Sequence, residues 1–439
     1  MALIFEPGTV LKTIQGNDIH IDSLHTDCGR GAIYQVTVNG QRKAFKWCTS
    51  SPLDSDFYSF WMRTKEKIER GAPCESILWP EDITDLSNGG FGYTMQLIPE
   101  GYQDFYDILS RKVGFSSFRS IIDIASNLVL VFQQLHRAGY CYYVHHGDFF
   151  VNSRSGAVFF THPDYIVPSG DQFNILGNLR YMAPEVVLGN ECPGVANEQY
   201  VMNIYLFMLL CMGHPLEGKQ SLVPAMSYEY QKKLYGSEAL FMMDSVNNSN
   251  GPHRLIHKNT ILLWNMLPAY IQALFHRSFG KQGLADSGSR VKEDAWIEAL
   301  CRLRGDILRC DCGSEMFLEE GMTGVCDACG KSLASTLRLD LSNYSLPATK
   351  GSRLFRCQLG EYPPEDALAP VALVVEKKDS PGVLGIQNLS EERWIATTSK
   401  GTSRTIDTHE VVPLKPGISI EICNSFLRIR EANSAPQDN

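Results

Sequence analysis

Four cysteines in the last third of the chain are spaced like metal ligands. They form two close pairs, Cys310-Asp-Cys312-Gly and Cys326-Asp-Ala-Cys329-Gly, with residues 313–325 between them. Four thiolates satisfy the tetrahedral coordination of Zn²⁺, and a glycine after each pair lets backbone N–H groups turn toward the sulfur atoms. The spacing therefore predicts a zinc ribbon whose metal is structural and supplies much of the folding free energy of this small module.

Composition and charge limit what the rest of the chain can do. The 13 cysteines among 439 residues are an odd number without the spacing of a disulfide framework. A formal charge of −9, from 40 basic and 49 acidic residues, argues against nucleic acid as a partner. The N-terminus lacks the pattern of a secretory signal, and the longest apolar run, Tyr200–Met212, is shorter than the ~20 residues of a membrane span. We therefore expect a cytoplasmic protein without a membrane partner.

The elements that must position the reactive side chains can be read from hydrophobic periodicity. Residues 17–48 alternate polar and apolar positions around an Asn39-Gly40 turn, which predicts an antiparallel sheet. Beyond this sheet, apolar residues recur at helical spacing. The predicted helices cover residues 56–70, 118–137, 200–213, 258–278 and 291–304. The pattern indicates an α+β fold, with a small β-rich lobe followed by a larger helical lobe.

Short motifs within this pattern resemble a protein kinase. They are AFKW at 44–47, LH at 135–136 and GNLRYMAPEVV at 177–187, in the order found in kinases. Longer phrases, among them IERGAPCESILWPEDIT, FGYTMQLIPEGY and GHPLEGK, resemble a bacterial serine/threonine protein kinase-like family that carries a C-terminal zinc ribbon. Together with the cysteine pairs, the resemblance covers roughly residues 5–340.

The resemblance implies a domain organisation and a biological setting. It implies a bilobal protein kinase-like domain over 1–304, with lobes at about 1–97 and 98–304, and a zinc ribbon over 305–340. Members of the family are often encoded beside a von Willebrand factor A (vWA) protein and a metal-dependent serine/threonine phosphatase, in tellurite-resistance-type triads. The resemblance therefore implies a signalling role with partners of these two kinds.

The glycine loop of this family is degenerate in the chain. A kinase cradles the phosphates of ATP with backbone N–H groups of this loop. Thr26 and Cys28 occupy the first two glycine positions, so that only Gly29 and Gly31 remain. Side chains at those positions impede the approach of the backbone to phosphate. We therefore expect ATP binding to be weakened or reshaped.

Lys46 of the AFKW motif matches the lysine that contacts the phosphates in kinases. In that family the lysine also pairs with a glutamate of the following helix. Spacing favours Glu66 as this partner, with Glu69 as the alternative. Lys46 is the strongest candidate for nucleotide binding.

The catalytic loop departs from the kinase pattern at the proton-accepting aspartate. Aligning Asp148 with the asparagine of the loop places Tyr143 at the catalytic position, and aligning from the preceding helix with one deletion places Val144 there. Neither side chain can accept a proton. His162 stands where the Mg²⁺-binding aspartate belongs, and imidazole prefers softer metals than Mg²⁺. Asp148, or Asp164 two residues after His162, could serve as a substitute ligand.

These replacements predict a pseudokinase that acts as a signalling scaffold or allosteric partner. One alternative is an atypical kinase or nucleotidyltransferase that uses ATP through Lys46 with Asp148 or Asp164. Another is an adaptor that binds phosphopeptides through its C-terminal module. One structural feature of kinases is retained, since Glu185 of the Ala-Pro-Glu motif is expected to pair with Arg290.

Residues 350–432 alternate like the strands of a β-sandwich. The run LGIQNLS, followed by VVPLKPGISIEIC, resembles the second half of a forkhead-associated domain, a family that reads phosphothreonine through an arginine and a serine on adjacent loops. The usual Gly-Arg and Ser-x-x-His signatures are not found here. Asn388 and Ser390 lie in the expected binding-loop region, where turn capping also accounts for them. We therefore expect a degenerate interaction domain of this type.

Overall fold

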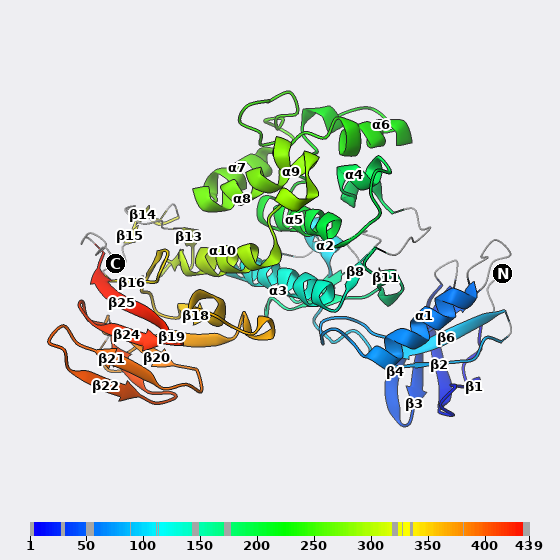
Figure 1. Cartoon of the computed structure of the whole chain (residues 1–439), viewed down its shortest axis with the longest axis horizontal. Helices are drawn as coiled ribbons and strands as arrows, with labels where there is room; N and C mark the ends of the chain where they lie inside the picture. The colour runs from blue at the N-terminus through cyan, green and yellow to red at the C-terminus, as the bar shows by residue number, and fades with distance from the viewer. Residues whose placement is uncertain are drawn as a thin grey trace.

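The computed structural model of the chain combines helices with antiparallel sheets in an α+β fold. A sheet near the N-terminus and a β-rich region near the C-terminus lie on opposite sides of a helical body (Figure 1). The structure describes residues 4–27, 31–49, 57–87, 89–110, 112, 114–142, 149–170, 177–317, 324–326, 328–333, 337–380 and 382–432.

The N-terminal sheet has the strand order β1-β2-β3-β4-β6-β5 and is antiparallel throughout. Its strands are β1 (Val10–Lys12), β2 (Asp18–Asp27), β3 (Gly31–Val38), β4 (Gln41–Thr49), β5 (Asp82–Ile83) and β6 (Gly90–Met95). The expected Asn39-Gly40 turn joins β3 to β4 with positive φ at both residues, 49° and 77°. Helix α1 (Phe57–Arg70) covers one face, where Phe57 and Phe60 pack against Phe91.

A single large hydrophobic core lies in the helical body. Helix α5 (Val195–Cys211) is buried at every position from Asn197 to Cys211, which confirms the apolar run as a core helix. The predicted helix over 258–278 is divided into α7 and α8 because Pro268 cannot continue the helical hydrogen-bond ladder. In the described part of the chain, no helix combines the length and apolar character needed to cross a membrane. The other helices are α2 (Phe105–Leu109), α3 (Phe118–Arg137), α4 (Pro184–Val187), α6 (Tyr228–Lys232), α7 (Lys258–Met266), α8 (Ala269–Phe279), α9 (Lys281–Ala285) and α10 (Glu293–Gly305).

Short strands connect the N-terminal sheet to this helical body. One sheet has the order β10-β9-β7, and β11 pairs with β8. The strands are β7 (Gln103–Asp104), β8 (Tyr140–Tyr142), β9 (Phe149–Val151), β10 (Val158–Phe160) and β11 (Ile166–Pro168). The short 3₁₀ helix η1 (Pro163–Tyr165) lies between β10 and β11 and is thereby fixed at both ends.

Two β-hairpins follow α10 and carry the cysteine pairs. They are formed by β12 (Ile307–Arg309) with β13 (Glu315–Phe317), and by β14 (Gly324–Val325) with β15 (Ser332–Leu333). The Glu315 carboxylate accepts the backbone N–H groups of Phe118 and Arg119 at 2.7 and 3.2 Å. A carboxylate at this position stabilises the N-terminus of α3, so the first hairpin is anchored to the helical body.

The C-terminal module consists of two antiparallel sheets around a core of its own. The six-stranded sheet has the order β17-β16-β25-β24-β21-β22, and the four-stranded sheet has the order β18-β19-β20-β23. Its strands are β16 (Leu337–Asp340), β17 (Ser345–Pro347), β18 (Arg353–Phe355), β19 (Pro370–Glu376), β20 (Leu384–Asn388), β21 (Trp394–Thr397), β22 (Ser403–Ile406), β23 (Val411–Pro413), β24 (Ser419–Ile422) and β25 (Ser425–Glu431). The expected boundaries at 340 and 350 need correction: β16 and β17 belong to this module because Leu339 and Leu346 are buried in its core.

Helix α10 attaches the C-terminal module to the helical body. The Arg302 guanidinium lies between two aromatic rings, 4.0 Å from the centroid of Tyr270 on α8 and 4.9 Å from that of Tyr344 after β16. The core of the helical body also includes Phe355 and Cys357, which follow from β18. Shared apolar packing and stacked cations therefore hold the two parts in a defined arrangement.

Candidate functional site

The sheet and the helical body meet at a partly buried carboxylate, Asp164 in η1. Lys46 on β4 and Tyr93 on β6 are direct partners in the antiparallel register, so their side chains leave the sheet on the same face. The Lys46 ammonium forms an ion pair with Asp164, and the Tyr93 hydroxyl donates a hydrogen bond of 2.5 Å to the second carboxylate oxygen. Both oxygens of Asp164 are therefore already engaged.

Helix α1 brings a second ammonium group to the same place. Lys67 and Thr64 are the buried residues of this helix. Lys67 Nζ donates to the backbone oxygen of Pro163 at 2.6 Å and lies 5.9 Å from the centroid of the Trp79 ring. We call Lys46, Lys67, Tyr93 and Asp164 the lysine cluster. Within the described residues, it holds two lysines around one carboxylate.

The charges of the lysine cluster are unbalanced. Burial lowers the pKa of Lys67 to about 8, against the attraction of Asp164. Burial also disfavours the charge of Lys46, but the adjacent Asp164 carboxylate outweighs it and raises the pKa of Lys46. The pKa of Asp164 is lowered, because Lys46 and Tyr93 stabilise its charge against the effect of burial. The cluster therefore carries net positive charge at neutral pH.

The structure pairs Lys46 with Asp164 rather than with the expected Glu66. Glu66 is exposed on α1, as is the alternative, Glu69. The inward position of the helix belongs to Lys67, which sequence reasoning missed. Lys67 follows Thr64 by three residues and so lies beside the apolar stripe of the helix. Helical periodicity could therefore have predicted that Lys67 faces inward.

The structure places only some of the other residues that were expected to bind nucleotide. Gly31 lies in β3, where a Cβ atom would come within 2.1 Å of the Trp47 carbonyl oxygen, so close strand packing alone requires glycine. His162 precedes η1, with its ring centroid 5.5 Å from that of Tyr165, and it is Asp164 that reaches Lys46. The remaining expected positions lie outside the described residues; they are Gly29, Tyr143, Val144 and Asp148.

A second buried cluster joins three helices of the body. His136 on α3 lies with its Nε2 atom 2.9 Å from Glu198 on α5 and its Nδ1 atom 2.5 Å from Glu293 on α10. Burial disfavours the imidazolium, but the two carboxylates outweigh it and raise the pKa of His136 to about 9. We call these three residues the histidine cluster. The Cys141 thiol is close to His136 and Glu198, but both ring nitrogens already have carboxylate partners, which leaves no histidine ligand for a metal.

The expected ion pair between Glu185 and Arg290 is present. Arg290 is completely buried and donates from Nη1 and Nη2 to the two carboxylate oxygens at 2.7 and 2.8 Å. Asn197 donates a further hydrogen bond of 2.6 Å to Glu185. Burial would raise the pKa of Glu185, but the guanidinium holds it below its usual value. Such a fork-to-fork pair fixes α4 against the segment that precedes α10, and Asn197 links α4 to α5.

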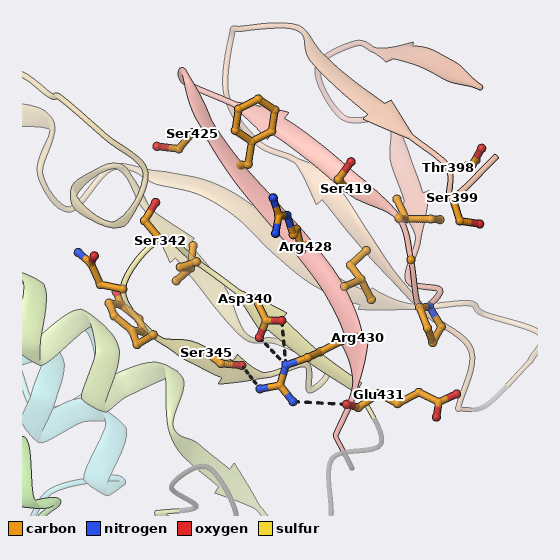
Figure 2. Close-up of a pocket in the computed structure, with 18 of the residues that line it drawn as sticks. Asp340, Ser342, Ser345, Thr398, Ser399, Ser419, Ser425, Arg428, Arg430 and Glu431 are labelled. Atoms are coloured by element: carbon orange, nitrogen blue, oxygen red, sulfur yellow. Dashed lines mark hydrogen bonds and ion pairs between the residues drawn. The ribbon is translucent and has the colours of Figure 1, made fainter. Parts of the chain in front are cut away.

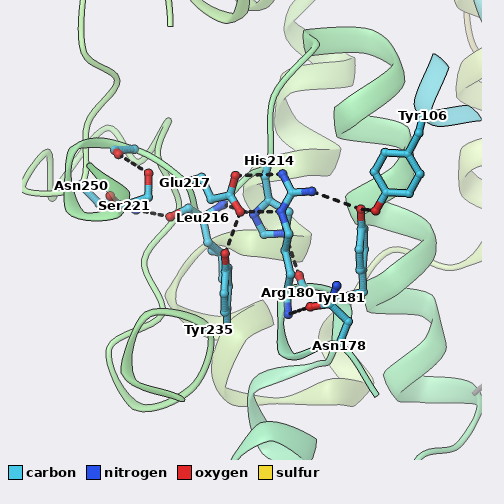
Figure 3. Close-up of polar contacts among 11 residues, drawn as sticks. Tyr106, Asn178, Arg180, Tyr181, His214, Leu216, Glu217, Ser221, Tyr235 and Asn250 are labelled. Carbon is cyan, nitrogen blue, oxygen red and sulfur yellow. Dashed lines mark hydrogen bonds and ion pairs between the residues drawn. The ribbon is translucent and has the colours of Figure 1, made fainter. Parts of the chain in front are cut away.

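A polar network fixes the segment that leads into Glu185 (Figure 3). Arg180 donates to both carboxylate oxygens of Glu217, at 2.5 and 2.9 Å, and the Tyr235 hydroxyl donates to the same carboxylate at 2.7 Å. His214 Nε2 donates to the backbone oxygen of Arg180 at 2.8 Å, and burial lowers the pKa of His214 to about 4, so the ring is neutral. The motifs LRYMAPEVV and GHPLEGK thus contact each other directly.

The four cysteines expected to bind metal come together at the tips of their hairpins. Their Sγ atoms all lie within 4.8 Å of one another. The separation is 3.5 Å between Cys310 and Cys329, and 3.6 Å between Cys312 and Cys326. This arrangement could hold a metal ion with four sulfur ligands.

The backbone turns around the cysteines suit such a site. Gly313 and Gly330 have φ angles of 94° and 71°, and their N–H groups donate to the carbonyl oxygens of Cys310 and Cys326. These left-handed conformations favour glycine, which explains the glycine after each pair. Backbone N–H groups, chiefly that of Cys329, lower the pKa of Cys326 to about 6, whereas at Cys312 and Cys329 backbone hydrogen bonds are outweighed by contacts with the neighbouring thiols, which raise the pKa. A stabilised thiolate is the form that binds metal.

The loop candidates of the C-terminal module have structural roles. Asn388 is completely buried, and its side chain donates to the Glu392 carbonyl oxygen at 2.8 Å and accepts from the backbone N–H of Ser390 at 2.9 Å. The Ser390 hydroxyl accepts the indole N–H of Trp394 at 3.1 Å. Turn capping therefore accounts for both residues.

Comparison with known proteins does not indicate a function for the chain. No protein-family model matches the chain, and no curated protein matches it either. The function has to be inferred from the lysine cluster, the cysteine site and the way the parts of the chain are joined.

Proposed function

We propose that the chain is a signalling pseudokinase, a protein kinase-like body that does not transfer phosphate and acts as a scaffold or allosteric partner. One observation carries the proposal. Where a kinase has a lysine paired with a helix glutamate beside an Mg²⁺-binding aspartate, this chain has two lysines around Asp164.

The arrangement of the elements supports a kinase-like body. A twisted antiparallel sheet with one helix, α1, is followed by a larger helical part, and the phosphate-type lysine, Lys46, lies on the strand directly before that helix. The pair between Glu185 and Arg290 is the one expected from the Ala-Pro-Glu motif. These features concern folding rather than chemistry, so they are compatible with an inactive protein.

The lysine cluster opposes phosphoryl transfer for an electrostatic reason. Transfer requires Mg²⁺ to bridge the phosphates through oxygen ligands. Asp164 is the carboxylate next to Lys46, and its oxygens are bound by Lys46 and Tyr93. The additional charge of Lys67 would repel a divalent cation at this position. We infer that any nucleotide bound here is held without metal-assisted chemistry.

Phosphotransfer assays test the proposal. The full-length protein is incubated with radiolabelled ATP and either Mg²⁺ or Mn²⁺, together with a vWA protein and a phosphatase as the partners that the resemblance suggests. No transfer to any protein is expected. Lys43 is a matched control because it lies on the same strand but pairs with Glu81 at 2.5 Å. Transfer that disappears in Lys46→Ala and persists in Lys43→Ala would overturn the proposal.

An atypical ATP-dependent enzyme is the second candidate, and the ion pair of Lys46 with Asp164 favours it. In a kinase the metal-binding aspartate and the phosphate-binding lysine face the same nucleotide, and here Asp164 lies beside Lys46. Thermal shift measurements separate the two candidates. The atypical enzyme requires Mn²⁺ or Mg²⁺ to increase the stabilisation by ATP, whereas the pseudokinase requires the metals to add nothing.

We also infer that the cysteine site binds structural Zn²⁺. Four sulfur ligands select zinc over Mg²⁺ or Ca²⁺, and no ligand position is left for substrate. Elemental analysis of the purified protein should give about one zinc per chain. Replacing Cys310 and Cys326 by serine should remove it, whereas replacing the exposed Cys192 should not. Retained zinc in the double variant would contradict the assignment.

A further inference from the structure

A cavity of the C-terminal module lies on the outer face of its six-stranded sheet. Its volume is about 970 Å³, and it is bounded by β16, β24 and β25 together with the tips of three hairpins (Figure 2). A volume of this size accepts a ligand larger than a single ion. Neither Asn388 nor Ser390 lines this cavity.

The strand register determines which side chains face the cavity. Asp340 is the direct partner of Arg428, and Arg428 is the direct partner of Ser419, so these three residues form a row across β16, β25 and β24. Direct partners lie on the same face of a sheet. The alternate residues Leu339 and Leu427 point the other way and are buried in the core. A polar row therefore follows from the same alternation that builds the core.

Within this row, Arg428 is the cation without an acidic partner. Asp340 could have paired with it, but both oxygens of Asp340 accept from Nε of Arg430, at 2.9 and 2.8 Å. Arg428 is exposed to the cavity and its side chain has no hydrogen bond or ion pair with another described residue. Figure 2 shows its guanidinium between Ser419 and the bound Asp340.

Hydroxyl groups line the same cavity, and that of Ser419 belongs to the direct strand partner of Arg428. Among the described residues, four serines that line the cavity make no side-chain hydrogen bond to protein; they are Ser342, Ser399, Ser419 and Ser425. A fork of N–H donors beside several free hydroxyl donors matches the tetrahedral oxygens of phosphate. Asp340 is paired with Arg430, and Glu431 is the other carboxylate among the residues that line the cavity.

A two-residue hairpin turn lies at the edge of the cavity. Cys423 and Asn424 connect β24 to β25 with φ angles of 52° and 62°, as a type I′ turn requires. Arg356 donates a hydrogen bond to the Cys423 sulfur and so helps to hold the turn. The turn places Asn424 and Ser425 on the cavity wall.

From these observations we propose that the cavity binds a phosphate ester through Arg428 and the surrounding serines. The site lies on the sheet face, away from the loop suggested by the sequence. It does not depend on the pseudokinase proposal, since it uses no residue of the kinase-like body. A phosphorylated side chain of a partner and a free phosphorylated metabolite share this chemistry.

Binding is tested with the full-length protein at constant ionic strength. The probes are inorganic phosphate, O-phosphoserine and a serine-phosphorylated peptide, compared with glutamate and the unphosphorylated peptide, using phosphorus NMR and calorimetry. We expect saturable binding of the phosphorylated probes and a loss of about tenfold or more in affinity in Arg428→Gln. Arg404→Gln is the matched control, because Arg404 is exposed on β22 of the same sheet, pairs with Glu410 and does not line the cavity.

The results distinguish a partner protein from a metabolite as the ligand, and both from the absence of a binding site. Tighter binding of the phosphopeptide than of O-phosphoserine would identify a partner protein as the source, and the reverse would identify a metabolite; both support the site. Equal affinity in wild type and Arg428→Gln would overturn it, as would equal binding of glutamate or no binding of any phosphorylated probe. Arg428→Lys keeps the charge without the fork, so an intermediate affinity is expected.

Discussion

The histidine cluster and the lysine cluster are both buried and both join separate segments, yet their charges are unbalanced in opposite directions. His136 is one cation between two carboxylates, and its pKa is raised to about 9. Lys46 and Lys67 are two cations around one carboxylate, and the pKa of Lys67 is lowered to about 8. Burial disfavours charge in both places. The number of counter-charges therefore decides which group keeps its proton.

This difference separates a structural site from one suited to a ligand. In the histidine cluster each ring nitrogen has a carboxylate, and the second oxygen of Glu198 accepts the backbone N–H of Tyr142 at 2.6 Å. Both ring nitrogens of His136 therefore have partners, and the cluster holds three helices together. The lysine cluster retains surplus positive charge, which attracts anions and repels Mg²⁺. Lys67 could thus supply the charge that a metal ion supplies to phosphate in a kinase.

The largest effect is expected from removing the single anion of the lysine cluster. Asp164→Asn leaves the buried Lys67 and the partly buried Lys46 without a counter-charge and should lower the free energy of unfolding by about 3–5 kcal/mol. Glu198→Gln leaves His136 paired with Glu293 and should cost only about 1–3 kcal/mol. Both are measured by urea unfolding at pH 7. If Glu198→Gln lowers the free energy of unfolding as much as Asp164→Asn does, the number of counter-charges does not explain the difference between the two clusters.

The contrast also shows where sequence reasoning succeeds. Periodicity predicted α3 and α10 closely, and motif spacing predicted the pair of Glu185 with Arg290, because both depend on regular geometry. The cysteine pairs were equally informative, since ligand spacing and turn glycines are local. These predictions needed no knowledge of which distant segments come into contact.

The lysine cluster could not be predicted in the same way. Asp164 reaches Lys46 because η1 is fixed between β10 and β11, and Lys67 takes the inward position of α1 where Glu66 was expected. A shift of one residue on a helix turns a side chain by about 100°, so periodicity separates Lys67 from Glu66, but it cannot show that η1 lies opposite Lys67. The β-sandwich boundary was misplaced for a similar reason, because pairing of β16 with β25 joins residues far apart in sequence.

The next effect is an opposite pH dependence of the two clusters. The pKa of His136 is raised from 6.5 to about 9. Its stabilising contribution to the free energy of unfolding is therefore fully present below pH 6.5 and is lost as pH rises to 9. The pKa of Lys67 is lowered from 10.5 to about 8. Its buried charge therefore destabilises the folded state fully below pH 8, and this destabilisation disappears as pH rises toward 10.5. Each shift corresponds to about 3 kcal/mol.

Subtracting the free energy of unfolding of a variant from that of wild type at each pH isolates the contribution of the replaced residue. The stability advantage of wild type over His136→Gln should decrease between pH 6.5 and 9, whereas that of wild type over Lys67→Met should increase between pH 8 and 10.5. Other groups titrate in both members of each pair and cancel. Slopes of the same sign would contradict the assigned charges.

The smallest effect is expected from removing the surplus cation itself. Lys67→Met removes a buried charge but leaves the Pro163 carbonyl oxygen without its ammonium donor. The two contributions oppose each other, and at pH 7 the variant should be more stable than wild type by about 1 kcal/mol. Lys65→Met on the same helix controls for the loss of a lysine outside the cluster. A loss of several kcal/mol in Lys67→Met alone would mean that the second lysine is a structural partner of Asp164, and that the lysine cluster, like the histidine cluster, is complete without a ligand.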